Sequence, residues 1–167
     1  MRRTGVLIGM LGLALLALAP AAQAGDNFVA TLSGDQEVPV QDTQAVGLAK
    51  FKLREDGTAL RFKVNVANLD NAVAAHIHCG AVGVNGPVGV TLFAGAPAGG
   101  AVNGTLAEGT ITAPDPANAC GWADLAAVLA AIGSGATYVN AHTHDGIPPI
   151  DTGPGDFPGG EIRGQIQ

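Results

Sequence analysis

The sequence predicts an all-β fold: an antiparallel, Greek-key-like β-sandwich of about eight strands, with one short α-helix around residues 122–132. Three observations predict it. Several short segments alternate apolar and polar residues with a period of two, as strands with one buried face do. Turn-forming residues separate these segments at regular intervals. Glycine, alanine and valine are abundant while aromatic residues make up 4% of the chain, which favours strands and turns over a helical bundle.

The clearest strands span residues 45–53 and 58–66, because both alternate strictly between apolar and polar residues. Between them, Asp56-Gly57 predicts a hairpin turn, since this pair tolerates the positive φ of tight turns. The polar faces of the two strands carry four cations, Lys50, Lys52, Arg61 and Lys63. One interpretation is an anion-binding patch. We favour a solvated face that discourages edge-to-edge aggregation.

The other elements follow from the same patterns. Residues 122–132 are the exception to period two: their apolar residues fall at helical spacing, and Gly133 and Gly135 end the segment. Residues 145–160 are rich in proline, glycine and aspartate and predict a long irregular loop. Connections are also expected at 33–44 and 95–104. Strands are expected at residues 27–32, 72–78, 87–93, 105–112, 136–144 and 161–167.

The N-terminus has the layout of a secretory signal peptide. Arg2 and Arg3 precede an apolar run, residues 6–19, and Ala22-Gln23-Ala24 forms a small-x-small cleavage signal. The run is short for a membrane span, so we expect residues 1–24 to be removed and no membrane span in the mature chain. Residues 25–167 then form a single domain, exported to the periplasm or out of the cell.

The charge of the mature chain limits its partners. Without Arg2 and Arg3, six basic and fourteen acidic residues remain, a net charge of −8. We expect no basic patch on such a chain, which argues against nucleic acid or an anionic membrane as a partner. The sequence therefore points to a metal ion or an exported protein as partner.

Cys79 and Cys120 are the two cysteines, and an even pair in an exported chain predicts a disulfide. The bond closes a loop of about forty residues, worth roughly 4 kcal/mol by the chain-entropy relation. Thiolate ligation of a metal is the less favoured alternative in an oxidising compartment.

All four histidines occur in two His-x-His pairs, His76/His78 and His142/His144. Side chains two apart on a strand share a face, so two imidazoles can converge on one metal ion. Both pairs are out of phase with the apolar residues of their strands, which predicts that they lie off the core side and in solvent. If the two strands are neighbours, four nitrogens suit zinc or copper, with Asp145 as an extra ligand. The alternative is four separate surface histidines that bind nothing.

Four segments resemble the CHRD (chordin-type) domain, in the order in which that family has them. They are Phe28–Gly34 with Gln36–Pro39, Ala74–His78 with Gly83–Val88, Tyr138–Thr143, and Gly159–Ile166. The chain is identified as a bacterial, single-domain, exported member. In chordin the domain is associated with a growth-factor antagonist.

The resemblance also bears on individual residues. His76, His78 and His142 fall where the family pattern has histidine, whereas His144 is additional and the loop after it is longer than usual. Glu161 and Arg163 match signature positions, and we interpret them as a cross-strand ion pair that closes the sandwich.

The sequence predicts an exported, non-catalytic binding protein that holds copper or zinc through His76, His78, His142 and His144. A metal-free protein-interaction or matrix module is the alternative. A copper redox enzyme of the superoxide dismutase type is less favoured, because it rests on analogy of fold alone. We recognise no catalytic constellation and expect no enzyme activity.

Overall fold

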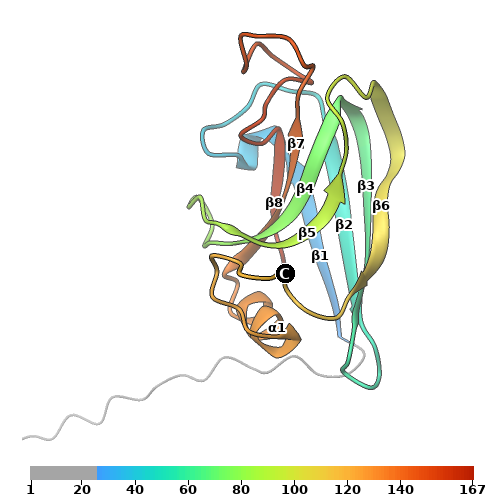
Figure 1. Cartoon of the computed structure of the whole chain (residues 1–167), viewed down its shortest axis with the longest axis vertical. Helices are drawn as coiled ribbons and strands as arrows, with labels where there is room; N and C mark the ends of the chain where they lie inside the picture. The colour runs from blue at the N-terminus through green and yellow to red at the C-terminus, as the bar shows by residue number, and fades with distance from the viewer. Residues whose placement is uncertain (1–25) are drawn as a thin grey trace, which may run out of the picture.

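The computed structural model describes residues 26–167, so the expected signal peptide lies outside the described residues. Within them the chain forms eight β-strands, one short 3₁₀ turn and one α-helix (Figure 1). In chain order these are β1 (Asn27–Ser33), η1 (Gly34–Gln36), β2 (Val46–Leu53), β3 (Leu60–Asp70), β4 (Ala72–Cys79), β5 (Val88–Ala94), β6 (Ala101–Ile111), α1 (Leu125–Gly133), β7 (Thr137–Thr143) and β8 (Ile162–Gln165). No helix in this part of the chain is long and apolar enough to cross a membrane.

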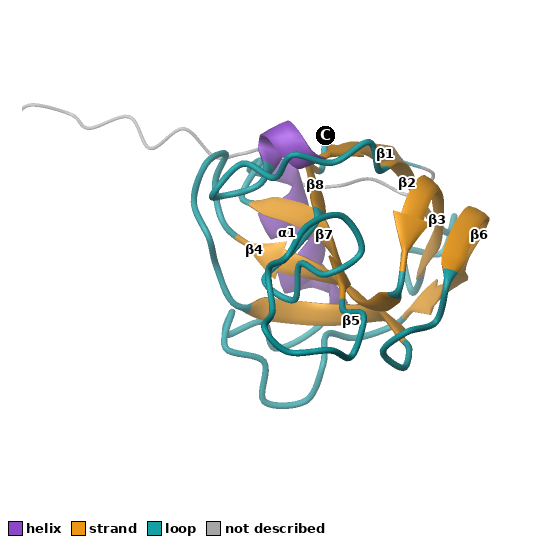
Figure 2. Ribbon diagram, turned by 90° about the horizontal axis from the view of Figure 1, so that it is seen from above, coloured by secondary structure: helices purple, strands orange, loops and turns teal. Residues whose placement is uncertain are grey.

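All eight strands pair antiparallel in one sheet, in the order β5-β4-β7-β8-β1-β2-β3-β6. The sheet curls until β5 contacts β6, so that two halves face each other across a common core (Figure 2). The prediction of about eight antiparallel strands and one helix is confirmed. The two layers of the expected sandwich are continuous through β8 and β1, which gives a barrel-like form.

The junction of the two halves depends on a close backbone approach. Val29 and Gln167 exchange two backbone hydrogen bonds, of 2.8 and 2.9 Å, just beyond the end of β8. Gly164 lies against the carbonyl of Thr31, where a Cβ atom has no room. A glycine is therefore required at this point of β8 for the sheet to continue into β1.

The core is built from the inward side of every strand, as the period-two pattern predicts. Phe51, Leu60 and Ile77 are among its fully buried members. The helix α1 closes one end of this core with Leu125, Val128, Leu129 and Ile132 (Figure 1). Asp124 caps its N-terminus, since the carboxylate accepts a hydrogen bond of 2.9 Å from the backbone N–H of Ala127.

The structure corrects the expected bounds of two strands. β3 continues to Asp70 and β6 begins at Ala101, although residues 95–104 read as a loop. The two extensions pair with each other, Leu69 with Val102, across a register shift. Asn103 and Gly104 look like turn residues in the sequence, but Gly104 pairs with Val66 of β3, and the side chain of Asn103 accepts a hydrogen bond of 2.9 Å from the N–H of Asn68.

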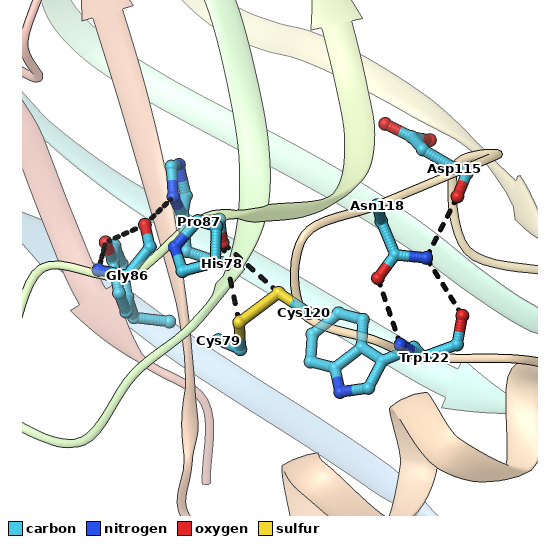
Figure 3. Close-up of a disulfide and its surroundings, with 9 residues drawn as sticks. His78, Cys79, Gly86, Pro87, Asp115, Asn118, Cys120 and Trp122 are labelled. Atoms are coloured by element: carbon cyan, nitrogen blue, oxygen red, sulfur yellow. Dashed lines mark hydrogen bonds between the residues drawn. A yellow bond between two sulfur atoms is a disulfide. The ribbon is translucent and has the colours of Figure 1, made fainter.

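The disulfide Cys79–Cys120 is formed, as predicted (Figure 3). It ties the connection between β6 and α1 to the end of β4. The side chain of Asn118 holds this connection together by accepting from the N–H of Trp122 at 3.0 Å and donating to the carbonyl of Asp115 at 3.0 Å. As a result, Asp115 rests over β5, where it accepts a hydrogen bond of 2.7 Å from Thr91.

The Gly164→Ala substitution tests the junction of the two halves. We expect it to lower the free energy of unfolding by about 1–3 kcal/mol, since a methyl group must be forced against the carbonyl of Thr31. Urea denaturation of both proteins measures this difference. Gly159→Ala is the matched control, because its added Cβ meets open space, and it should leave the stability nearly unchanged. Equal effects of the two substitutions would contradict the close approach.

Candidate metal centre

Three of the four histidines meet on the outer face of the sheet, because β4 and β7 are antiparallel neighbours. In their register His76 faces Asn140 and His78 faces Tyr138, so the rings of β4 lie beside His142 of β7. Ring centroids are 5.5 Å apart for His76 and His78, 5.0 Å for His76 and His142, and 5.9 Å for His78 and His142. One ring nitrogen of each lies within 4.8 Å of those of the other two. We call these three residues the histidine cluster.

Backbone carbonyls fix two of the three rings. Nδ1 of His78 lies 2.9 Å from the carbonyl oxygen of Gly86, and Nδ1 of His142 lies 2.8 Å from that of Pro158. A carbonyl oxygen only accepts, so each Nδ1 carries the hydrogen and each Nε2 of the neutral ring keeps its lone pair. Nε2 of His142 is 3.2 Å from Nδ1 of His76, while Nε2 of His78 is buried without a hydrogen-bond partner. This is the orientation that metal-ligating histidines take from their outer-sphere partners.

The sequence predicted that the histidines lie in solvent. The structure corrects this, because loops cover the histidine cluster. The side of the sheet was predicted correctly, yet His78 is only 7% exposed and the other two are half-buried. Loss of solvent, together with repulsion among the rings, lowers the pKa of His76 and of His78 to about 4. Burial also lowers the pKa of His142. All three imidazoles are therefore neutral at pH 7, which is the form that binds metal.

Tyr138 and Arg163 support the histidine cluster from the next strands of the sheet. The Tyr138 ring stacks on His78 with centroids 4.8 Å apart and an angle of 6° between the planes. The guanidinium of Arg163 lies 3.4 Å from the centre of the same ring. Since β7 lies between β4 and β8, the tyrosine is held between the histidine and the arginine.

Arg163 also anchors the loop that orients His78. Its side chain is buried, and it donates to the carbonyls of Ala81 and Val84 at 3.1 and 2.9 Å and to the amide oxygen of Asn85 at 3.0 Å. These acceptors belong to the β4–β5 loop, which also contains Gly86. Because the loop is tied to Arg163, the carbonyl of Gly86 is in place to fix the His78 ring.

Glu37 and Asn140 form a second buried contact beside the cluster. The amide of Asn140, the residue opposite His76, donates to the carboxylate of Glu37 at 2.6 Å. Burial raises the pKa of Glu37 from its ordinary value near 4.5 to about 7, although the charge of Arg163 opposes the shift. Glu37 therefore titrates in the neutral range.

The predicted ion pair between Glu161 and Arg163 is wrong. Glu161 accepts hydrogen bonds of 2.6 Å from the hydroxyls of Thr43 and Thr143, and one of 2.9 Å from the N–H of Gly155. Arg163 makes the separate contacts described above. Both side chains are buried, Glu161 just before β8 and Arg163 within it, but they are held by different partners.

His144 does not join the histidine cluster, so the predicted four-histidine set with Asp145 is divided. The strand β7 ends at Thr143, and His144 turns toward Asp156, whose carboxylate lies 2.9 Å from its Nδ1. Asp145 is the third member of this separate group. Asp156 also accepts hydrogen bonds from Thr152, and its contact with His144 lowers the pKa of its carboxyl group. This group fixes the long loop that supplies Pro158 to His142.

Several residues at the site were not singled out by the sequence analysis as site residues. They are Glu37, Asp115, Tyr138, Asn140 and, as an anchor of the loop, Arg163. Asp115 reaches the site through the disulfide-bonded connection, and its charge acts on His76. The other four lie within the CHRD-like segments. Those motifs were therefore the one feature of the sequence that could have indicated that these residues lie together.

The comparison with protein families decides the relationship. The sequence model of the CHRD domain matches residues 28–166. The chain belongs to the CHRD domain family. Neither the comparison with curated proteins nor that with solved structures gives a match. In this CHRD domain the four family-like segments meet on one face, around Arg163 and the histidine cluster.

The titration of Glu37 predicts a pH dependence of stability. A folded-state pKa of about 7 against an ordinary value of 4.5 gives a contribution that is present below pH 4.5 and lost as the pH rises through 7. The cluster acts oppositely, because its lowered pKa values remove stability as the pH falls from 6.5 toward 4. Glu37→Gln keeps an acceptor for the amide of Asn140 and removes only the pH-dependent contribution of Glu37 to stability.

We therefore expect the stability of Glu37→Gln, relative to the unsubstituted protein, to increase from pH 5 to about pH 7 and to level off by pH 8. Urea denaturation at unit pH steps measures it. Glu108→Gln, at an exposed position, should show no such trend. A difference for Glu37→Gln that is independent of pH would show that Glu37 is ionised throughout.

Proposed function

We propose that this CHRD domain is an exported, non-catalytic binding protein that holds one zinc or copper ion through His76, His78 and His142. The observation that carries the proposal is Nε2 of His78, which is buried, lacks a partner and faces two further imidazoles. An unsatisfied buried polar atom destabilises a protein by about 1–3 kcal/mol. A metal ion at the cluster would satisfy it.

The donor set supports zinc or copper over other metals. Imidazole nitrogen suits these ions, whereas calcium and magnesium take oxygen ligands. The three rings come from two adjacent strands of a packed sheet, and two of them are fixed by backbone carbonyls. Such a set binds with little loss of side-chain freedom. Because the rings are neutral, the ion displaces no imidazolium protons at pH 7.

Export and the absence of catalysis are the other parts of the proposal. The signal-like N-terminus and the disulfide Cys79–Cys120 both support an oxidising compartment. The cluster is packed under two loops, which favours holding an ion over turning over a substrate.

Metal titration of the purified mature chain, residues 25–167, tests the proposal. Zinc and copper are added separately against a chelator of known affinity. We expect one ion per chain and a higher melting temperature, since a ligand that binds only the folded state stabilises it. His78→Gln should weaken binding by more than the roughly 10–100-fold that outer-sphere substitutions cause. His144→Gln is the matched control and should leave the affinity nearly unchanged.

Two results would contradict the proposal in different ways. If neither ion binds or shifts the melting temperature, the metal-free interaction module is the better account. If copper binds and the loaded protein consumes superoxide, the protein is a redox enzyme. Equal loss of affinity in the His78 and His144 variants would contradict the division of the histidines into two groups.

A further inference from the structure

The exposed cations of the described chain are gathered in one place. Six basic residues lie in residues 26–167, and one of them, Arg163, is buried. The other five are exposed and lie on the hairpin of β2 and β3, namely Lys50, Lys52, Arg54, Arg61 and Lys63. The expectation that this acidic chain forms no basic patch is therefore wrong. We call Lys50, Lys52, Arg61 and Lys63 the cationic face.

The cationic face sets like charges opposite each other. In the register of β2 and β3, Lys50 pairs with Lys63 and Lys52 pairs with Arg61. Directly opposed side chains have Cβ atoms ~4.5–5.5 Å apart, and like charges at that distance destabilise a sheet. Lys63 has an exposed partner in Glu108 at 3.0 Å, on β6. Within the described residues, no carboxylate forms an ion pair with the other three.

Protection of a sheet edge does not explain this arrangement. Lysines prevent aggregation when they lie on an unpaired edge strand. Here β2 lies between β1 and β3, and β3 lies between β2 and β6, so neither strand is an edge. A face with opposite charges across the two strands would be equally well solvated, and such pairs stabilise a sheet. The opposed cations destabilise the fold and do not protect it from aggregation. Such a cost is typical of a surface that binds a ligand.

The cationic face is hollowed along the hairpin. One shallow groove of about 320 Å³ includes Lys50 and Lys63, and a second of about 440 Å³ reaches the turn at Asp56. Both grooves are lined by Lys52 and Arg61, so they adjoin at these two residues. The shape suits a long, narrow ligand that lies along the strands.

We propose that the cationic face binds a linear acidic polysaccharide, whose repeated anionic groups pair with Lys50, Lys52, Arg61 and Lys63. A narrow polymer that lies along the strands touches the four cations, and the carboxylates it approaches there are those of Glu108, which pairs with Lys63, and of Glu55 and Asp56 at the turn. A membrane is a broad anionic plane, which the fourteen acidic residues of the chain oppose. Single-stranded nucleic acid needs aromatic platforms for its bases, and the phenylalanines of these strands point to the other side, where Phe51 is buried.

The cationic face is separate from the histidine cluster. It belongs to β2 and β3, whereas the cluster belongs to β4 and β7. The proposal therefore stands independently of metal binding.

Binding of the mature protein to alginate and to dextran sulfate, with neutral dextran as reference, tests the proposal. We expect affinity for the acidic polymers that falls steeply between 20 and 200 mM salt, because screening acts on exposed charges. Lys52→Gln/Arg61→Gln should reduce the affinity at least tenfold. Its melting temperature should stay the same or rise, since a pair of like charges has been removed. Lys50→Gln/Lys63→Gln is a second variant with the same expectation.

A matched pair of substitutions separates the local charge from the net charge. Glu108→Gln frees Lys63 and should strengthen binding severalfold. Asp35→Asn changes the net charge equally at an exposed site off this face and should have little effect. Equal effects of the two would overturn the proposal, as would unchanged binding by both double variants. Equal or tighter binding to neutral dextran, phosphatidylglycerol vesicles or single-stranded DNA would also overturn it.

Discussion

The burial of the Arg163 guanidinium is the constraint on which the outer face of β4, β7 and β8 depends. A cation removed from water must have its donors satisfied. Three acceptors of the β4–β5 loop and the ring of Tyr138 meet this requirement, so the loop has to fold down onto the sheet. The polar layer that results takes the place of the solvent that usually covers one face of an antiparallel sheet.

The geometry of the histidine cluster depends on this polar layer. The phase of β4 and β7 decides the side of the sheet, and the loops then decide the tautomer of each fixed ring. Burial by the same loops keeps the rings neutral. The contacts that orient the rings and keep them neutral therefore also stabilise the fold, which explains why the CHRD-like motifs and the histidines coincide in this chain.

The sequence predicted local features well and distant ones poorly. Alternation with a period of two predicted the strands and the side on which His76 and His78 lie, because phase is a local property. It did not predict their burial, since the loops that cover them come from elsewhere in the chain. His144 has the same spacing as the others, but the end of β7 at Thr143 separates it. The net charge says nothing of how cations are distributed; the alternation of residues 45–53 and 58–66 placed four of them on one face, but did not show why they lie there.

Nitrogen-15 NMR of the histidine rings in the metal-free protein tests the central claim most directly. The account predicts that His78 and His142 are neutral at pH 7, with hydrogen on Nδ1 and none on Nε2, and that His78 stays neutral as the pH is lowered to 5. Addition of one equivalent of zinc should then shift Nε2 of both rings and leave His144 unchanged. Hydrogen on Nε2 of either ring, or an imidazolium at pH 7, would contradict it.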